Sequence, residues 1–192
     1  MKYWPCILCM TLGLLVSCDH DPVLTPKKRM YPRLELPDAV YNRADIQTCP
    51  FSWALPVGTE IELQRDHGGN RCWFDVHWPA LHATLHCSYY PIDEDHSLSS
   101  LIGDAYEMVS KHNVKAYFRE EDPITNAEHS GLLFSIAGPV ASPHQFFITD
   151  ENNHFLRGSL YFDKKVVSDS VAPIVDYLKS DMDQMLSSLR FK

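Results

Sequence analysis

Three histidines lie close together in the sequence and could act as metal ligands. His77, His82 and His86 flank the turn residues Pro79-Ala80 of an expected hairpin. The even spacing of His82 and His86 would place both on one strand face, and the turn could bring His77 near them. A catalytic zinc ion needs three such ligands and an open position. Because neither HExxH nor paired CxxC accompanies them, we interpret them as half-exposed strand residues, with a metalloenzyme as the alternative.

A second group of polar side chains belongs to two consecutive expected strands and the turn between them. In an antiparallel pair, Arg157 could meet Gln145 or the carboxylate of Asp150. We interpret the group as a hydrogen-bonded network that fixes the hairpin, with a recognition patch as the alternative. No GxSxG motif is present, so we expect no catalytic residue and no cofactor. The members of the group are His144, Gln145, Asp150, His154 and Arg157.

Alternating hydrophobicity and turn residues predict the strands that position these groups. The charged run Glu120-Glu121-Asp122 is expected in a loop, with its side chains in solvent. The expected strands are Phe51–Leu55, Glu60–Gln64, Trp73–Trp78, Ala83–Tyr90, Val114–Arg119, His129–Ile136, Gln145–Thr149 and Phe155–Phe162.

Two segments carry apolar residues at helical spacing. The first runs from Leu98 to Val109, with Ser97 as N-cap and Asn113 as the stop. The second begins near Ser168 or Ser170, and its apolar stripe reaches position 189. The order of elements predicts an α+β fold, a mainly antiparallel sheet with two packed helices, in a single domain over residues 39–192.

The N-terminus resembles a bacterial lipoprotein signal. Residues 1–17 contain Lys2 and a short apolar segment, and they end in Leu15-Val16-Ser17 directly before Cys18. Signal peptidase II requires small residues before the cysteine that receives the lipid, so we expect lipidation of Cys18. The alternative is an ordinary signal peptide followed by an incidental cysteine.

Residues 18–38 have the composition of a tether and precede the expected domain. Four prolines make this segment semi-rigid, and Lys27-Lys28-Arg29 is expected to be solvated, with a contact to anionic lipid headgroups as the alternative. The whole chain has 17 basic and 25 acidic residues and a net charge of −8. This acidic balance without a basic stripe argues against nucleic acid as a partner.

Export would place the mature chain in an oxidising compartment, where cysteines pair. Cys49 and Cys72 could form a disulfide that closes a 24-residue loop, counting both cysteines. Cys87 would then stay single and buried in a strand. A Cys72–Cys87 disulfide is the main alternative, because sequence alone does not set connectivity.

Several stretches of the chain are similar to the gliding motility-associated lipoprotein family GldD of the Bacteroidota. They are Pro26-Lys27-Lys28-Arg29, Cys49-Pro50-Phe51-Ser52, Cys72-Trp73-Phe74-Asp75, 83–89, 111–116, 142–150, 154–162 and 170–178. The resemblance implies an outer-membrane lipoprotein, on the periplasmic face, that takes part in gliding and type IX secretion. It implies no enzymatic activity, and it implies partners among the other gliding and secretion lipoproteins and outer-membrane components.

The order of strands and helices also resembles the PsbP/Mog1-like sandwich, which is an expectation about fold alone. A small-ligand-binding module is therefore an alternative function. A pocket lined by Trp73, Tyr89 and Phe147 would support it.

Overall fold

A computed structural model describes residues 35–36, 38–46, 49–64, 72–126, 128–163 and 168–192. The compact unit that contains them spans Leu34–Lys192, whereas we expected the domain to begin at residue 39. The expected signal peptide, Cys18 and residues 18–34 of the tether lie outside the described residues.

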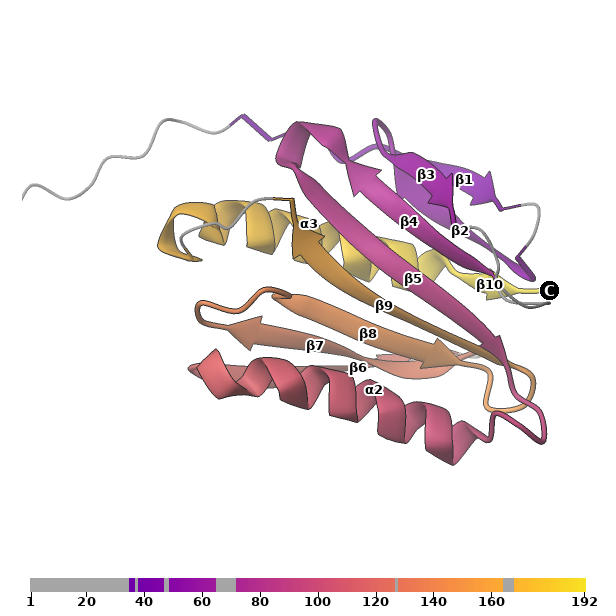
Figure 1. Cartoon of the computed structure of the whole chain (residues 1–192). Coiled ribbons are helices and arrows are strands. Elements are labelled where there is room, and N and C mark those ends of the chain that lie inside the picture. Colours follow the sequence, from indigo (N-terminus) through magenta and orange to yellow (C-terminus); the bar gives the residue numbers. More distant parts are fainter. Residues whose placement is uncertain (1–34, 37, 47–48, 65–71, 127, 164–167) are drawn as a thin grey trace, which may run out of the picture. The chain divides into compact units, whose positions relative to one another are not determined.

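The larger sheet has seven antiparallel strands in the order β3-β4-β5-β9-β8-β7-β6 (Figure 1). Strands that follow one another along the chain pair in this sheet, except that β5 pairs with β9, which follows it only after α2 and three further strands. The strands are β3 (Glu60–Leu63), β4 (Trp73–Trp78), β5 (Ala83–Pro91), β6 (Phe118–Thr125), β7 (Ser130–Ala137), β8 (His144–Thr149) and β9 (His154–Phe162).

A second sheet combines the two ends of the compact unit. Strand β2 (Phe51–Pro56) pairs with β1 (Tyr41–Asp45) on one side and with β10 (Arg190–Phe191) on the other. Sequence patterns predicted β2 and missed its two neighbours. The reason is that β1 is largely exposed and β10 is two residues long, so neither shows the alternation of a half-buried strand.

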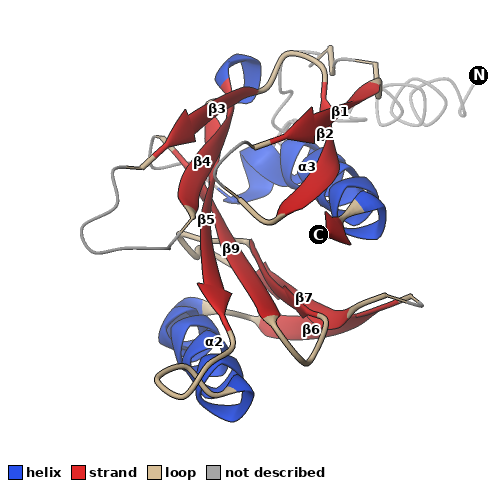
Figure 2. Cartoon of the chain, turned by 90° about the vertical axis from the view of Figure 1, so that its right-hand side faces the viewer, coloured by secondary structure: helices blue, strands red, loops and turns tan. Residues whose placement is uncertain are grey.

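The two helices lie on opposite faces of the larger sheet. Figure 2 shows α2 (Leu98–His112) on one face, and α3 (Ser168–Ser188) with the β1-β2-β10 sheet on the other. Short 3₁₀ turns, η2 (Pro79–Leu81) and η3 (Asn113–Lys115), follow β4 and α2. The expected α+β fold with a mainly antiparallel sheet and two packed helices is confirmed. Within the described part of the chain, no helix has the length and apolar character needed to cross a membrane.

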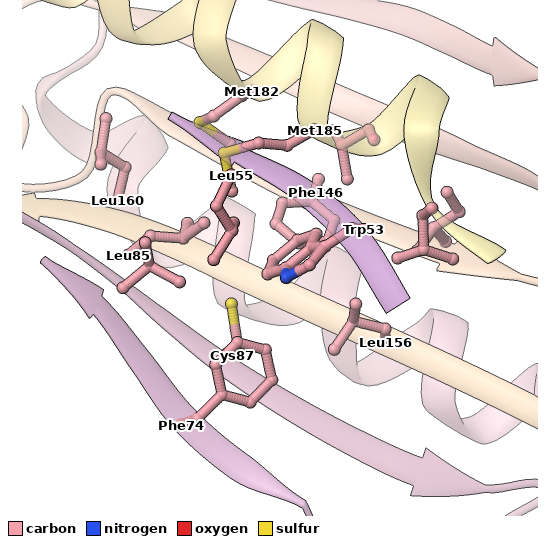
Figure 3. Packing of buried hydrophobic residues seen from close by; sticks show 14 of the residues in the cluster. Trp53, Leu55, Phe74, Leu85, Cys87, Phe146, Leu156, Leu160, Met182 and Met185 are labelled. Atoms are coloured by element: carbon pink, nitrogen blue, oxygen red, sulfur yellow. The ribbon is translucent and has the colours of Figure 1, made fainter. Parts of the chain in front are cut away.

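Successive side chains of each strand point to opposite faces of the larger sheet, and they form a separate hydrophobic core on each face. The larger core packs Phe51, Trp53 and Leu55 of β2 against α3 and the inner face of the sheet. Figure 3 shows Trp53 in this core, together with Phe146, Leu156, Met182 and Met185. The smaller core packs the apolar stripe of α2 on the opposite sheet face. Period-two alternation in a strand buried on both sides is the physical reason for two cores.

The segment after α2 corrects two expectations. Val114–Arg119 was predicted as a strand, yet η3 covers its start and β6 begins at Phe118. The run Glu120-Glu121-Asp122, expected in a loop, lies within β6. This strand is an edge of the sheet, where charged side chains and a proline such as Pro123 are tolerated because one row of backbone groups needs no partner strand.

Candidate functional site

The face of β4 and β5 that points away from the larger core carries a buried carboxylate. The Asp75 side chain is only 10% exposed. The amide of Gln64 donates to its Oδ2 at 2.6 Å, and Nδ1 of His86 lies 2.8 Å from its Oδ1. Both oxygens of Asp75 are thus engaged within the protein. The interaction orients the His86 imidazole, whose ring also lies against Tyr161.

The three histidines of the sequence-predicted metal site lie in different surroundings. His77 pairs across the strands with Thr84 through a 3.1 Å contact and approaches Glu62 at 3.3 Å. His86 shares this sheet face and binds Asp75, while His82 ends η2 in a left-handed conformation, 3.8 Å from Asp163. In the described residues, no three His, Cys, Asp or Glu side chains gather as metal ligands.

The polar group of the β8–β9 hairpin does not form one network. Successive side chains of a strand alternate between faces, so His144 and His154 point towards the larger core side, while Gln145 and Arg157 point towards α2. The expected contact of Arg157 with Gln145 or Asp150 is wrong. Arg157 pairs in register with Phe147, and its guanidinium lies 5.3 Å from the ring centre of Tyr90 and donates to the Tyr90 hydroxyl.

His144 is the most deeply buried of these polar groups on the α3 side. Its side chain joins three elements: Nδ1 lies 3.3 Å from the hydroxyl of Ser135 in β7, and Nε2 lies 3.2 Å from the carbonyl oxygen of Val175 in α3. The neutral imidazole satisfies both contacts by donating to the carbonyl and accepting from the hydroxyl. The pKa of His144 is lowered to about 4, mainly by burial and also by nearby Lys179, while the hydrogen bond to the Val175 carbonyl opposes the shift.

His154 connects the sheet to the C-terminal strand. Its ring stacks on Phe191 of β10 at 5.0 Å, and its Nδ1 lies 2.8 Å from the hydroxyl of Tyr89. Gln145, on the opposite face, accepts a hydrogen bond from Ser159 in the neighbouring strand. Both residues thus take part in structural contacts between elements.

Asp150 organises the turn between β8 and β9. One of its carboxylate oxygens accepts backbone N–H groups of Asn152, Asn153 and His154 at 2.8–3.1 Å. Partial burial opposes its ionisation, but these hydrogen bonds outweigh burial and lower the pKa of Asp150. The turn is therefore fixed by its own first residue, which is a common role of aspartate in turns.

Asp181 is a buried polar residue that the sequence analysis missed. It lies on α3 at 1% exposure, where it accepts the hydroxyl of Tyr41 at 2.7 Å and the indole N–H of Trp78 at 3.0 Å. Burial raises the pKa of Asp181, although the two hydrogen bonds oppose the shift. The available signal was its position beside Met182 within an apolar stripe, where a carboxylate needs partners.

The three cysteines in the described part of the chain are a disulfide-bonded pair and a single thiol. Cys49 and Cys72 form a disulfide with a Cα–Cα distance of 5.4 Å, which links the start of β2 to the start of β4. Cys87 of β5 is a buried free thiol among Trp53, Phe74 and Leu156 (Figure 3). Burial raises its pKa well above the ordinary value, which keeps the thiol protonated and unreactive.

The pocket that would have supported the small-ligand alternative does not form from its three residues. Tyr89 belongs to the larger core and Phe147 to the smaller one, so they lie on opposite faces of the sheet. Trp73, on β4 beside β5, lies three strands away from β8, which carries Phe147. A different hollow exists where the β7–β8 connection meets α3. It is a cleft of about 310 Å³ with mainly apolar walls, among them Tyr117, Val140 and Val175.

Comparisons with known proteins identify a family to which the chain is similar. A family model described as gliding motility lipoprotein GldD matches residues 21–191. A comparison with curated proteins found no match. Among solved structures, the chain is similar to the solution structure of cyanobacterial PsbP (CyanoP) from Synechocystis sp. PCC 6803. The identity is 12% and the TM-score 0.46, with 94% of this chain and 100% of that chain covered.

Proposed function

The chain belongs to the gliding motility lipoprotein GldD family, and on that premise we propose that it is a non-enzymatic accessory protein of gliding and type IX secretion. It acts from the outer membrane, on the periplasmic face, where it supports the assembly or stability of partner lipoproteins. The observation that carries the proposal is the extent of the family match. Residues 21–191 include all of the compact body except its last residue, and part of the tether before it.

The proposed anchor is the lipidated Cys18. Acyl chains contribute about 0.8 kcal/mol for each buried CH₂ group, so several chains on one residue hold a protein at a bilayer. Cys18 and Leu34 are 16 positions apart, so the chain between them reaches roughly 55 Å when fully extended. The body can therefore contact partners that stand well away from its attachment point.

The polar groups of the body support an accessory role. Asp75 is held by Gln64 and His86, while Asp181 is held by Tyr41 and Trp78. These contacts join strands and helices to one another, which favours a rigid body that presents surfaces to partners. The proposal assigns the interaction to such surfaces and gives none of these groups a catalytic step.

Deletion and complementation test the role in the cell. We expect a deletion strain to lose secretion of type IX cargo, and to lose gliding where the host glides. Wild-type protein should restore both, Cys18→Ala should be released from the membrane and restore neither, and Ser17→Ala should act as wild type because it keeps a small residue before Cys18. Normal secretion and gliding in the deletion strain would refute the proposal.

Purification of the tagged protein from gently solubilised membranes tests the partner. Stoichiometric recovery of gliding or secretion lipoproteins, identified by mass spectrometry, is the expected result. Reduced amounts of the same lipoproteins in the deletion strain would show the stabilising role. Recovery of the protein alone, together with unchanged lipoprotein levels, would contradict it.

A further inference from the structure

The most exposed large hydrophobic residues of the described chain are concentrated at one place. Val114 is 87% exposed, Tyr117 is 78% exposed and Phe118 is 60% exposed. Val114 is in η3, directly after α2, Phe118 begins β6, and Tyr117 lies between these two elements. We call residues 111–118 the tip. Three such side chains within five positions form a patch, which differs from the single exposed hydrophobics that any surface carries.

The apolar surface continues from the tip into the cleft described above. Tyr117 is one of the cleft walls, and the others come from the β7–β8 connection, the end of β9 and the first turns of α3. Pro139, Val140 and Phe162 also line a wider hollow beside Lys111 and Lys115. The tip thus borders two hollows, one with mainly apolar walls and one that Asp163 also lines.

The charge of the tip is opposite to that of the chain. Residues 111–118 contain Lys111 and Lys115 and no carboxylate, although the whole chain carries −8. Lys111 forms a solvent-exposed ion pair with Glu107, one turn earlier in α2. Exposed pairs of this kind are weak and can exchange for another anion.

We propose that the tip docks on an anionic lipid surface, with Val114, Tyr117 and Phe118 entering the headgroup region and Lys111 and Lys115 contacting lipid phosphates. Tyrosine and phenylalanine beside lysines are the side chains that proteins place at this boundary. An exposed apolar segment with two lysines suits a deformable lipid layer, whereas a folded protein partner would need a surface of matching shape. The patch is also small for a stable protein interface.

This inference rests on the proposed function for one element, the lipid anchor at Cys18. Anchoring holds the body within the roughly 55 Å reach of the tether, so the local concentration of lipid is high. A contact that is weak in solution is then populated on the membrane.

Vesicle co-sedimentation tests the contact without the anchor. The probe is vesicles of phosphatidylethanolamine and phosphatidylglycerol, with the full mature chain, residues 18–192, made without lipid and with its disulfide formed. We expect measurable binding, reduced about tenfold or more by the triple substitution Val114→Ser, Tyr117→Ser, Phe118→Ser. Lys111→Gln with Lys115→Gln should also weaken binding about tenfold, and neutral phosphatidylcholine vesicles should bind wild type correspondingly less.

The matched control makes the same substitution to serine at three other exposed apolar residues. Val40→Ser, Val57→Ser, Leu63→Ser replaces three side chains that are 48–54% exposed, and it should bind as wild type. No binding by wild type, or equal loss in both triple variants, would overturn the inference. Unchanged vesicle binding of the tip variant with loss of partner lipoproteins would make the tip a protein interface and would overturn it too.

The two proposals fail in different ways. If Cys18→Ala leaves secretion and gliding normal while the lipid-free chain still binds vesicles through the tip, the proposed function fails and the docking surface stands. If the lipid-free chain does not bind and Cys18→Ala abolishes secretion, the docking surface fails and the proposed function stands.

Discussion

The burial of His144 predicts an acid-sensitive contribution to stability. In the folded protein its imidazole lies between Ser135 and the Val175 carbonyl, and its pKa is lowered to about 4. In the unfolded chain a histidine has a pKa of about 6.5. Between these values the unfolded state binds a proton that the folded state does not, so stability falls as the pH falls. The charged groups that face His144 are Lys179, Asp176 and Asp122.

The size of the effect follows from the two pKa values. Relative to pH 7.5, this one group should remove roughly 1 kcal/mol at pH 5.5 and roughly 2–3 kcal/mol at pH 4.5. His144→Gln keeps a donor and an acceptor but does not titrate. Over the same pH range, the free energy of unfolding of the variant should therefore fall by that much less than that of wild type. This holds even if the substitution itself changes the stability at pH 7.5.

Urea denaturation of both proteins from pH 7.5 to 4.5 measures this difference. Both proteins contain the same other titrating groups, including the carboxylates, so the contributions of these groups to the pH dependence cancel in the comparison. His82→Gln, which removes an exposed imidazole, is the matched control for loss of a histidine as such. The prediction concerns the difference in free energy of unfolding between wild type and His144→Gln. If this difference changes by less than about 1 kcal/mol from pH 7.5 to 4.5, the burial argument is wrong.

Three further perturbations test the body by chemical denaturation at pH 7.5. Replacing Cys49 and Cys72 with serine should lower the free energy of unfolding by about 3.4 kcal/mol, because the disulfide closes a long loop of the unfolded chain, and an unchanged midpoint would contradict this. Asp181→Ala should cost about 2–4 kcal/mol, because a buried indole N–H loses its acceptor and a cavity remains; a cost below about 1 kcal/mol would argue against the role of the carboxylate. Gly131→Ala should cost about 2 kcal/mol or more, because the added Cβ meets the backbone of β8. Gly103→Ala, inside α2 with open space around it, is the control and should stabilise by about 0.5–1 kcal/mol.

Local sequence patterns determined the elements whose burial is regular. Ala83–Tyr90 alternates because one side chain in two enters the larger core, and the paired strand β4 is its neighbour through a short turn. The α2 stripe begins after Ser97, whose hydroxyl accepts the N–H of Ser100 as an N-cap. These features are set by periodicity and by groups within a few residues, so the sequence alone suffices to predict them.

Tertiary structure decided the features that depend on residues far apart in the chain. Strands β1 and β10 form because β2 is between them, although neither segment has a strand pattern of its own. Arg157 contacts Tyr90 because β9 pairs with β5 as well as β8, and local reasoning considered the β8 hairpin alone. Asp181 is satisfied by groups 103 and 140 positions away, which no local pattern could indicate.

The same division holds for function. The lipoprotein-signal pattern before Cys18 and the resemblance of many short segments pointed to a lipoprotein family from the sequence alone, because those signals are written in consecutive residues. The tip is different. Val114, Tyr117 and Phe118 looked like part of a half-buried strand, and their exposure follows from the end of α2, the 3₁₀ turn and the edge position of β6. Which face a side chain takes is fixed by what packs on the element, and that is a property of the folded chain.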